Sequence, residues 1–105
     1  MPATADALYD KTRPVTLSGT VKAFDFSGPH VQVHFDVKDK SGATATWTAV
    51  SGSPGDVYRA GWTAKSLKAG DTITVAGLPA KDGSKTLNVR KLTAPGGKTL
   101  TEGAE

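Results

Sequence analysis

Strict alternation of apolar and polar residues is the clearest pattern in this chain, and it runs from Val31 to Lys38. The apolar members are Val31, Val33, Phe35 and Val37, and the polar members are Gln32, His34, Asp36 and Lys38. A period of two residues predicts a β-strand with one buried face and one solvent-facing side. Because a shift of one residue would bury four polar side chains, the pattern also fixes the register of this strand.

Four further segments have the composition of strands, at residues 15–23, 43–50, 72–78 and 86–93. In the first of them the apolar positions are odd-numbered through Ala23 and then move to the even-numbered Phe24 and Phe26. Such a change of phase predicts a β-bulge near Ala23 and Phe24, which lets one long strand take part in both halves of a curled sheet.

A short helical segment is predicted between the third and fourth strands. Ser53 suits the cap position, Pro54 the first helical position and Asp56 the first turn, while Gly61 is a natural left-handed stop. The following residues predict a second helical turn over 62–67, with Thr63 as its cap and Trp62 packed on Leu67.

Three strands, a helical segment and two strands therefore follow one another along the chain. This order predicts an all-β fold, a five-stranded OB-like Greek-key barrel with a short helical segment between strands 3 and 4. We expect residues 1–14 to form an N-terminal arm, 15–101 the barrel domain and 102–105 a C-terminal tail. A short edge strand is predicted at Thr99 and Leu100, and Leu8 and Tyr9 of the arm are expected to dock onto the barrel.

The composition narrows the class of protein further. With 105 residues the chain is expected to form a single domain, and its 12 glycines and 6 prolines indicate many turns. The lack of cysteine excludes disulfides, thiolate metal sites and cysteine nucleophiles. No apolar run approaches the ~20 residues of a membrane helix, so we expect no membrane insertion. The net charge of +3 is typical of a soluble monomer.

The two histidines, His30 and His34, are candidate metal ligands on the polar face of the second strand. Residues four apart on a strand are separated by ~13 Å, whereas two ligands of one ion lie within about 4 Å of each other. The pair therefore cannot chelate one ion. His30, at the turn formed by Ser27, Gly28 and Pro29, remains the candidate ligand for copper or zinc.

Other site chemistry is sparse. There is no Ser-His-Asp order, paired-acid cleft or phosphate-cradling glycine motif, so we predict neither an enzyme nor a cofactor. The exposed faces of strands 2 and 3 have no aromatic platform for stacking bases, which argues against nucleic acid. Five residues are candidates for ligand contact, and they come from the turn and the helical segment: Pro29, His30, Tyr58, Arg59 and Trp62. A role in the core is the alternative for Trp62 and for Trp47, which we expect to fill space beside Gly19 and Ala23.

Several short motifs together resemble a bacterial family, the domain of unknown function 6152. They are Gly28-Pro29-His30, Asp36-Val37-Lys38-Asp39, Trp47, Gly52-Ser53-Pro54, Arg59-Ala60-Gly61-Trp62-Thr63, Leu67-Lys68-Ala69-Gly70-Asp71 and Lys81-Asp82-Gly83-Ser84. The resemblance covers about residues 9–100. It implies a small exported, periplasmic, OB-like β-barrel without an assigned activity.

The chain also departs from that family's pattern. Members typically read Trp-Thr-Asn-Pro-His where this chain has Phe26-Ser27-Gly28-Pro29-His30, and carry an acid where this chain has Val50. Many have a His-His pair near the mature N-terminus, where this chain has Ala3-Thr4-Ala5-Asp6. If the family binds metal through His and Glu, only His30 carries over.

We therefore expect a non-enzymatic, secreted periplasmic binding or accessory domain with an unknown small molecule or protein as its partner. Met1-Pro2 precedes the small residues Ala3-Thr4-Ala5, which we interpret as the place where a signal peptide was removed. Two alternatives stay open. One is a copper- or zinc-binding protein centred on His30, and the other is an OB domain that binds single-stranded nucleic acid.

Overall fold

The computed structural model describes residues 8–101 and 103 of the chain. Its elements are β1 (Val15–Asp25), β2 (Gln32–Lys38), β3 (Thr44–Val50), α2 (Pro54–Arg59), β4 (Thr72–Pro79), β5 (Thr86–Thr93), the 3-10 turn η1 (Pro95–Gly97) and β6 (Thr99–Leu100). The interpretation of Met1 to Ala5 as a signal-peptide junction lies outside the described residues. None of the helices in the described part of the chain is long and apolar enough to cross a membrane.

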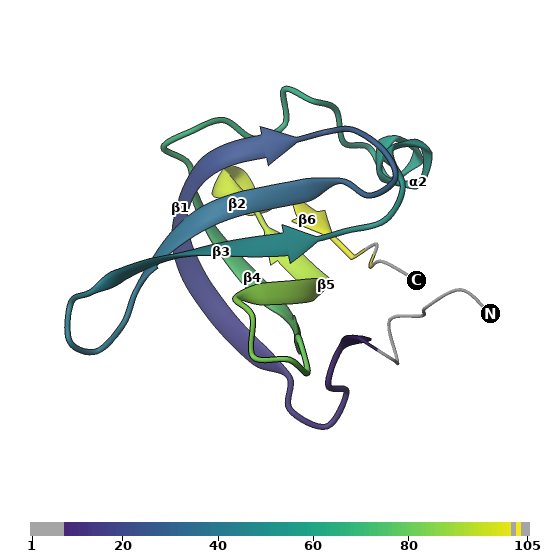
Figure 1. Cartoon of the computed structure of the whole chain (residues 1–105). Helices are drawn as coiled ribbons and strands as arrows, with labels where there is room; N and C mark the ends of the chain where they lie inside the picture. Colours follow the sequence, from purple (N-terminus) through teal and green to yellow (C-terminus); the bar gives the residue numbers. More distant parts are fainter. Residues whose placement is uncertain (1–7, 102, 104–105) are drawn as a thin grey trace.

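The strands close into a barrel (Figure 1). They are hydrogen-bonded in the order β3-β2-β1-β4-β5-β6, and a parallel pairing of β3 with β5 joins the two sides of the sheet. The other pairings are antiparallel. The predicted fold class, a small five-stranded all-β barrel with a short helix between strands 3 and 4, is confirmed.

β1 is long enough to serve both halves of the barrel. Its first half pairs with β4, from Val15 opposite Gly77 to Thr20 opposite Thr72, and its second half pairs with β2. The register with β2 shifts between Val21 and Ala23, which makes Lys22 the extra residue of a β-bulge. The predicted bulge is thus present, but it comes before Ala23 and turns that side chain outward.

The barrel interior is filled by the apolar positions of the strands and by residues of the helical insertion. The largest fully buried side chains include Trp62, Phe35 and Ile73. A Cβ added to Gly19 would lie 2.2 Å from the carbonyl oxygen of Asp36 and 3.0 Å from the Phe35 ring. The space beside Gly19 that we expected Trp47 to fill is therefore occupied by the β2 backbone and Phe35.

The short helix begins and ends where the sequence predicts. The Ser53 side chain accepts a hydrogen bond from the Asp56 amide at 3.2 Å, and Gly61 follows the helix with φ +98°. The second helical turn predicted over 62–67 is present only as a single hydrogen-bonded turn and not as a helix, with the Thr63 side chain accepting from the Lys65 amide at 3.3 Å. In this turn the Ser66 amide donates to the Thr63 carbonyl at 2.9 Å.

The end of the arm adds to the barrel beyond β4. Tyr9 pairs with Ala80, and the Asp10 amide donates to the Pro79 carbonyl at 2.8 Å. Tyr9 is buried, as expected of a docked residue, whereas Leu8 is 52% exposed. At the other terminus, Gly103 forms an isolated bridge with Ser51.

Candidate ligand-binding site

Four of the five predicted contact residues lie on the surface at one end of the barrel, here named the helix end, which α2 and residues 60–70 cover. The Val31 amide donates to the Gly52 carbonyl at 2.9 Å, and the Ser51 amide donates to the Val31 carbonyl at 2.8 Å. These bonds hold the β1–β2 connection, with Pro29 and His30, against the start of α2 (Figure 1).

The four surface members of this group differ in how far they are exposed. Pro29 is exposed, His30 is half-buried and Tyr58 is 64% exposed on the outer side of α2. Arg59 forms an ion pair with Asp56 of the same helix, and both side chains are mostly in solvent. Pro29, Tyr58 and Arg59 are therefore open to solvent at the helix end.

Trp62, the fifth predicted contact residue, is fully buried in the core. Its indole Nε1 donates to the Thr99 carbonyl at 3.1 Å. The Lys98 Nζ lies 5.2 Å from the centre of the indole ring and donates to the Gly61 carbonyl at 2.5 Å. No part of the Trp62 side chain is accessible to a ligand, so Trp62 seals the helix end.

The outer face of β2 and β3 is polar, as the alternation predicts. His34 Nδ1 shares a hydrogen bond of 2.9 Å with the Thr48 hydroxyl, and the Thr46 hydroxyl donates to the Asp36 carboxylate at 2.7 Å. Within residues 8–101 and 103, no three His, Cys, Asp or Glu side chains gather closely enough to hold a metal ion. A metal at His30 stays a prediction.

A hollow of about 270 Å³ lies at the opposite end of the barrel, here named the arm end, where residues 8–14 meet the β4–β5 loop. We call this hollow the arm-end pocket. Its lining residues are Asp10, Arg13, Trp47, Pro79, Ala80, Lys81, Gly83 and Ser84. Trp47 reaches it from the inner face of β3 and is half-buried. The pocket thus combines one partly exposed aromatic side chain with charged side chains from two different segments.

The loop that forms one wall of the arm-end pocket is held by its own hydrogen bonds. The Asp82 carboxylate accepts from the Ser84 amide at 2.8 Å, and hydrogen bonds from Ser84 hold the pKa of Asp82 below its ordinary value. Gly83 has φ +83°, and its amide donates to the Ala80 carbonyl at 3.3 Å. The Lys81 amide donates to the Leu8 carbonyl at 2.9 Å, which ties the loop to the arm.

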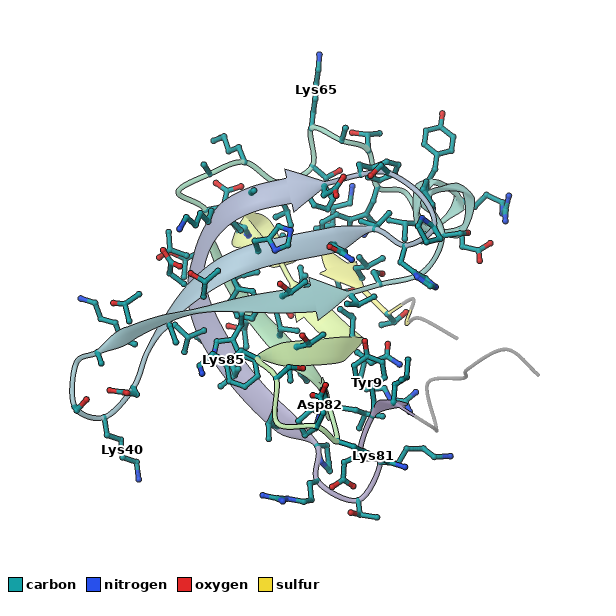
Figure 2. The ribbon with its side chains drawn as sticks, viewed as in Figure 1. Tyr9, Lys40, Lys65, Lys81, Asp82 and Lys85 are labelled. Carbon is teal, nitrogen blue, oxygen red and sulfur yellow. The ribbon has the colours of Figure 1, made fainter. Side chains whose placement is uncertain are left out.

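Figure 2 shows Tyr9, Lys81 and Asp82 at this end of the barrel. Hydrogen bonds from Thr12 lower the pKa of the Asp10 carboxyl, and the cations Arg13 and Lys81 lower it further. Burial raises the pKa of the Tyr9 phenol, and the Asp82 carboxylate raises it further. Asp10 is therefore charged at neutral pH and faces two cations.

The arm-end pocket was missed in the sequence because its residues come from three distant segments. The signal that identifies it is topological. In an OB-like barrel β3 closes against β5, and here Thr48 lies opposite Thr86. That register places Trp47 beside the β4–β5 loop. The proximity of Trp47 to Lys81 could therefore have been predicted from the expected fold.

A second hollow, of about 490 Å³, opens where β1 leaves β2. It is lined by Gly19, Thr20, Asp36, Lys38 and Thr44. Ligand sites are usually concave and mostly apolar with a few polar groups, whereas this lining has neither an aromatic nor a large apolar side chain. The arm-end pocket is the better candidate site.

Comparison with known proteins gives a family but no activity. No curated protein and no solved structure matches the chain significantly. A family model does match, over residues 2–88, and it is described as a family of unknown function (DUF6152). Because the match spans most of the 105 residues, the chain belongs to the DUF6152 family of unknown function.

Proposed function

We propose that this chain is a non-enzymatic binding domain that takes its ligand in the arm-end pocket. The observation that carries the proposal is the position of Trp47. Its indole is half-buried in the wall of a hollow that Arg13 and Lys81 border. An aromatic surface with a few convergent polar groups in a concavity is the usual composition of a small-molecule site.

The geometry favours binding over catalysis. The titratable lining residues are Asp10, Arg13 and Lys81, and the carboxylate of Asp10 already accepts two hydrogen bonds from Thr12, at 2.6 and 2.9 Å. A general base needs a free acceptor near the substrate and a pKa near the working pH. Both Thr12 bonds end on Oδ1 of Asp10, and the lowered pKa of this carboxyl makes it a weak base at neutral pH, so Asp10 does not meet the second condition.

Neither alternative function gains a specific supporting contact. His30 is half-buried at the helix end, and among the described residues no group of three or more His, Cys, Asp or Glu side chains could hold a metal ion. The outer face of β2 and β3 carries hydrogen-bonded Thr, His and Asp side chains where a single strand would need aromatic rings.

We also propose that the domain works in the periplasm as a secreted binding or accessory protein. This location rests on the family resemblance. Cell fractionation of the product of the complete reading frame, with cytoplasmic and periplasmic marker enzymes, tests it. Recovery with the periplasmic marker is expected, and recovery with the cytoplasmic marker would overturn the proposed location.

A fragment screen by NMR tests the binding site itself. The two indole N–H signals of the ¹⁵N-labelled protein report on the two ends, because Trp47 borders the arm-end pocket and Trp62 is buried at the helix end. We expect small neutral and charged aromatic fragments to shift the Trp47 signal together with the amides of Gly83 and Ser84. Fragments that shift only residues near His30 and Tyr58 would place the site at the helix end instead.

A further inference from the structure

The charge and size of the arm-end pocket identify the class of ligand that it fits. We propose that the pocket binds a small monoanionic carboxylate attached to a single flat ring. This inference rests on the proposed binding function and adds the ligand's size, charge and shape.

The size of the hollow limits the ligand to about one ring. Pockets for drug-sized molecules have volumes of ~300–1,000 Å³. The arm-end pocket, at about 270 Å³, lies just below that range. A ring with one substituent fits this volume, whereas a dinucleotide or an extended peptide would have most of its surface outside.

The charges of the lining select an anion. Among the lining residues, Arg13 and Lys81 are cations and Asp10 is the carboxylate, which leaves one net positive charge. Neither cation forms a salt bridge with a described acid, although both act on Asp10 electrostatically. A carboxylate on the ligand would gain charge-assisted hydrogen bonds from the guanidinium and ammonium groups.

The backbone contributes little to anion recognition, because the loop uses its own donors. The amides of Lys81, Gly83 and Ser84 donate to the Leu8 carbonyl, the Ala80 carbonyl and the Asp82 carboxylate, respectively. Selectivity for charge therefore depends on the Arg13 and Lys81 side chains, which makes it accessible to single substitutions.

The apolar part of the lining favours a flat group. Trp47 offers an indole ring, and Pro79 and Ala80 line the pocket from the end of β4. Aromatic rings gain from offset stacking or edge-to-face contact with one another, and arginine also stacks on flat rings. A ligand ring beside Trp47 can hold its carboxylate toward Arg13 and Lys81.

Benzoate is the probe that tests this inference, with benzamide as its uncharged analogue and acetate as the anion without a ring. Each is titrated at neutral pH into the full chain while the indole N–H signal of Trp47 is followed. We expect benzoate to shift this signal saturably, and benzamide and acetate each to bind about tenfold or more weakly, since a hydrogen bond to a charged group and ring contact are lost in turn.

Charge-matched variants separate the pocket from the general basicity of the chain. Arg13→Gln and Lys81→Gln should each weaken benzoate about tenfold. Lys65→Gln removes the same charge at the far side of the molecule (Figure 2) and should leave the affinity unchanged. Unchanged amide shifts outside the pocket show that the variants are folded. Equal losses in all three variants would overturn the proposed site for the anion.

The remaining outcomes distinguish the inference from the proposed function. Equal affinity for benzoate and benzamide overturns the anionic ligand and supports a binding site at Trp47. If acetate binds as tightly as benzoate, the inference that the ligand carries a flat ring is overturned. If neither benzoate nor any neutral fragment shifts the Trp47 signal, the ligand class and the proposed function are both wrong.

Discussion

The two tryptophans mark the two ends of the barrel, and they differ in what covers them. At the helix end, Trp62 is fully buried among core residues and is held by Thr99 and Lys98. At the arm end, Trp47 is half-buried beside a polar loop and a hollow. Trp62 thus completes the core, whereas part of the Trp47 indole remains accessible to a ligand. The difference arises from the chain segments that pack on each indole.

The largest expected effect comes from truncating these two side chains. Trp62→Ala should lower the free energy of unfolding by about 3–5 kcal/mol, because it leaves a cavity in a packed core. Trp47→Ala should cost roughly 1–2 kcal/mol, since part of that side chain already contacts water. Urea denaturation followed by circular dichroism measures both. Trp62→Phe serves as a milder variant should Trp62→Ala not fold.

The difference between the two ends would be disproved if Trp47→Ala and Trp62→Ala lowered the free energy of unfolding equally. Equal losses in the free energy of unfolding would mean that Trp47 supports the core as strongly as Trp62 does. The arm-end pocket would then be a gap in the packing and not a binding site. A much smaller loss for Trp47→Ala supports its role as an exposed binding surface.

The next effect concerns Gly19, which lies on β1 between the two ends. A Cβ at this position would lie 2.2 Å from a backbone oxygen of β2, so Gly19→Ala should cost roughly 1–3 kcal/mol. Gly55→Ala is the matched control, because its Cβ would meet the Arg59 guanidinium at an ordinary 3.6 Å. We expect that variant to gain up to about 0.5 kcal/mol from helix propensity.

The Gly19 variant also shows whether the ends are coupled. Because β1 pairs with both β4 and β2, the indole signals of Trp47 and Trp62 should be lost at the same urea concentration in Gly19→Ala. Loss of the Trp47 signal well before the Trp62 signal would show that the arm end unfolds independently.

A smaller effect is expected from Lys98, which covers Trp62 from the solvent side. Lys98→Met keeps an apolar stem but removes the cation over the indole and the hydrogen bond to the Gly61 carbonyl. The loss should be about 0.5–1 kcal/mol, typical of an exposed cation–π contact. Thermal denaturation measures it, with Lys65→Met as the control. An unchanged melting temperature would mean that Trp62 alone seals the helix end.

The smallest effect is confined to alkaline pH and concerns Tyr9 at the arm end. Its pKa is raised above the unfolded value by burial and by Asp82, so the folded state holds the phenol proton more tightly. The associated stability is fully present below about pH 10 and is lost as the pH rises through the folded pKa.

We therefore expect the urea midpoint of the wild type to fall between about pH 9 and pH 11 more steeply than that of Tyr9→Phe. Tyr58→Phe, which removes an exposed phenol from the helix end, should follow the wild type. A Tyr9→Phe profile that parallels the wild type would show that the Tyr9 phenol titrates alike in the folded and unfolded states.

The strands could be predicted because each carries its own local signal. The alternation from Val31 to Lys38 defines β2, and Ser53 and Gly61 bound the short helix through cap chemistry. The change of phase locates the bulge only near Ala23 and Phe24, because alanine is small enough for either face and does not reveal that the extra residue is Lys22.

The site could not be predicted in the same way, because no local pattern connects its parts. Arg13, Trp47 and Lys81 meet only once the barrel has closed. Conversely, Trp62 looked like a contact residue beside Tyr58, and only the packing around Thr99 and Lys98 shows that it faces inward. Side-chain direction after a turn depends on tertiary contacts, which a single sequence does not display.

The parallel pairing of β3 with β5 has a mechanical consequence for the arm end. It consists of three residue pairs, from Thr48 opposite Thr86 to Val50 opposite Asn88, and it is the shortest ladder of the five that close the barrel. The β3–β5 pairing is therefore the weakest closure of the barrel. Local opening is expected there, because the fewest contacts must be broken. Trp47 lies on the β3 side of this pairing and the β4–β5 loop on the β5 side. A ligand bound between Trp47 and Lys81 would therefore stabilise the β3–β5 pairing against local opening.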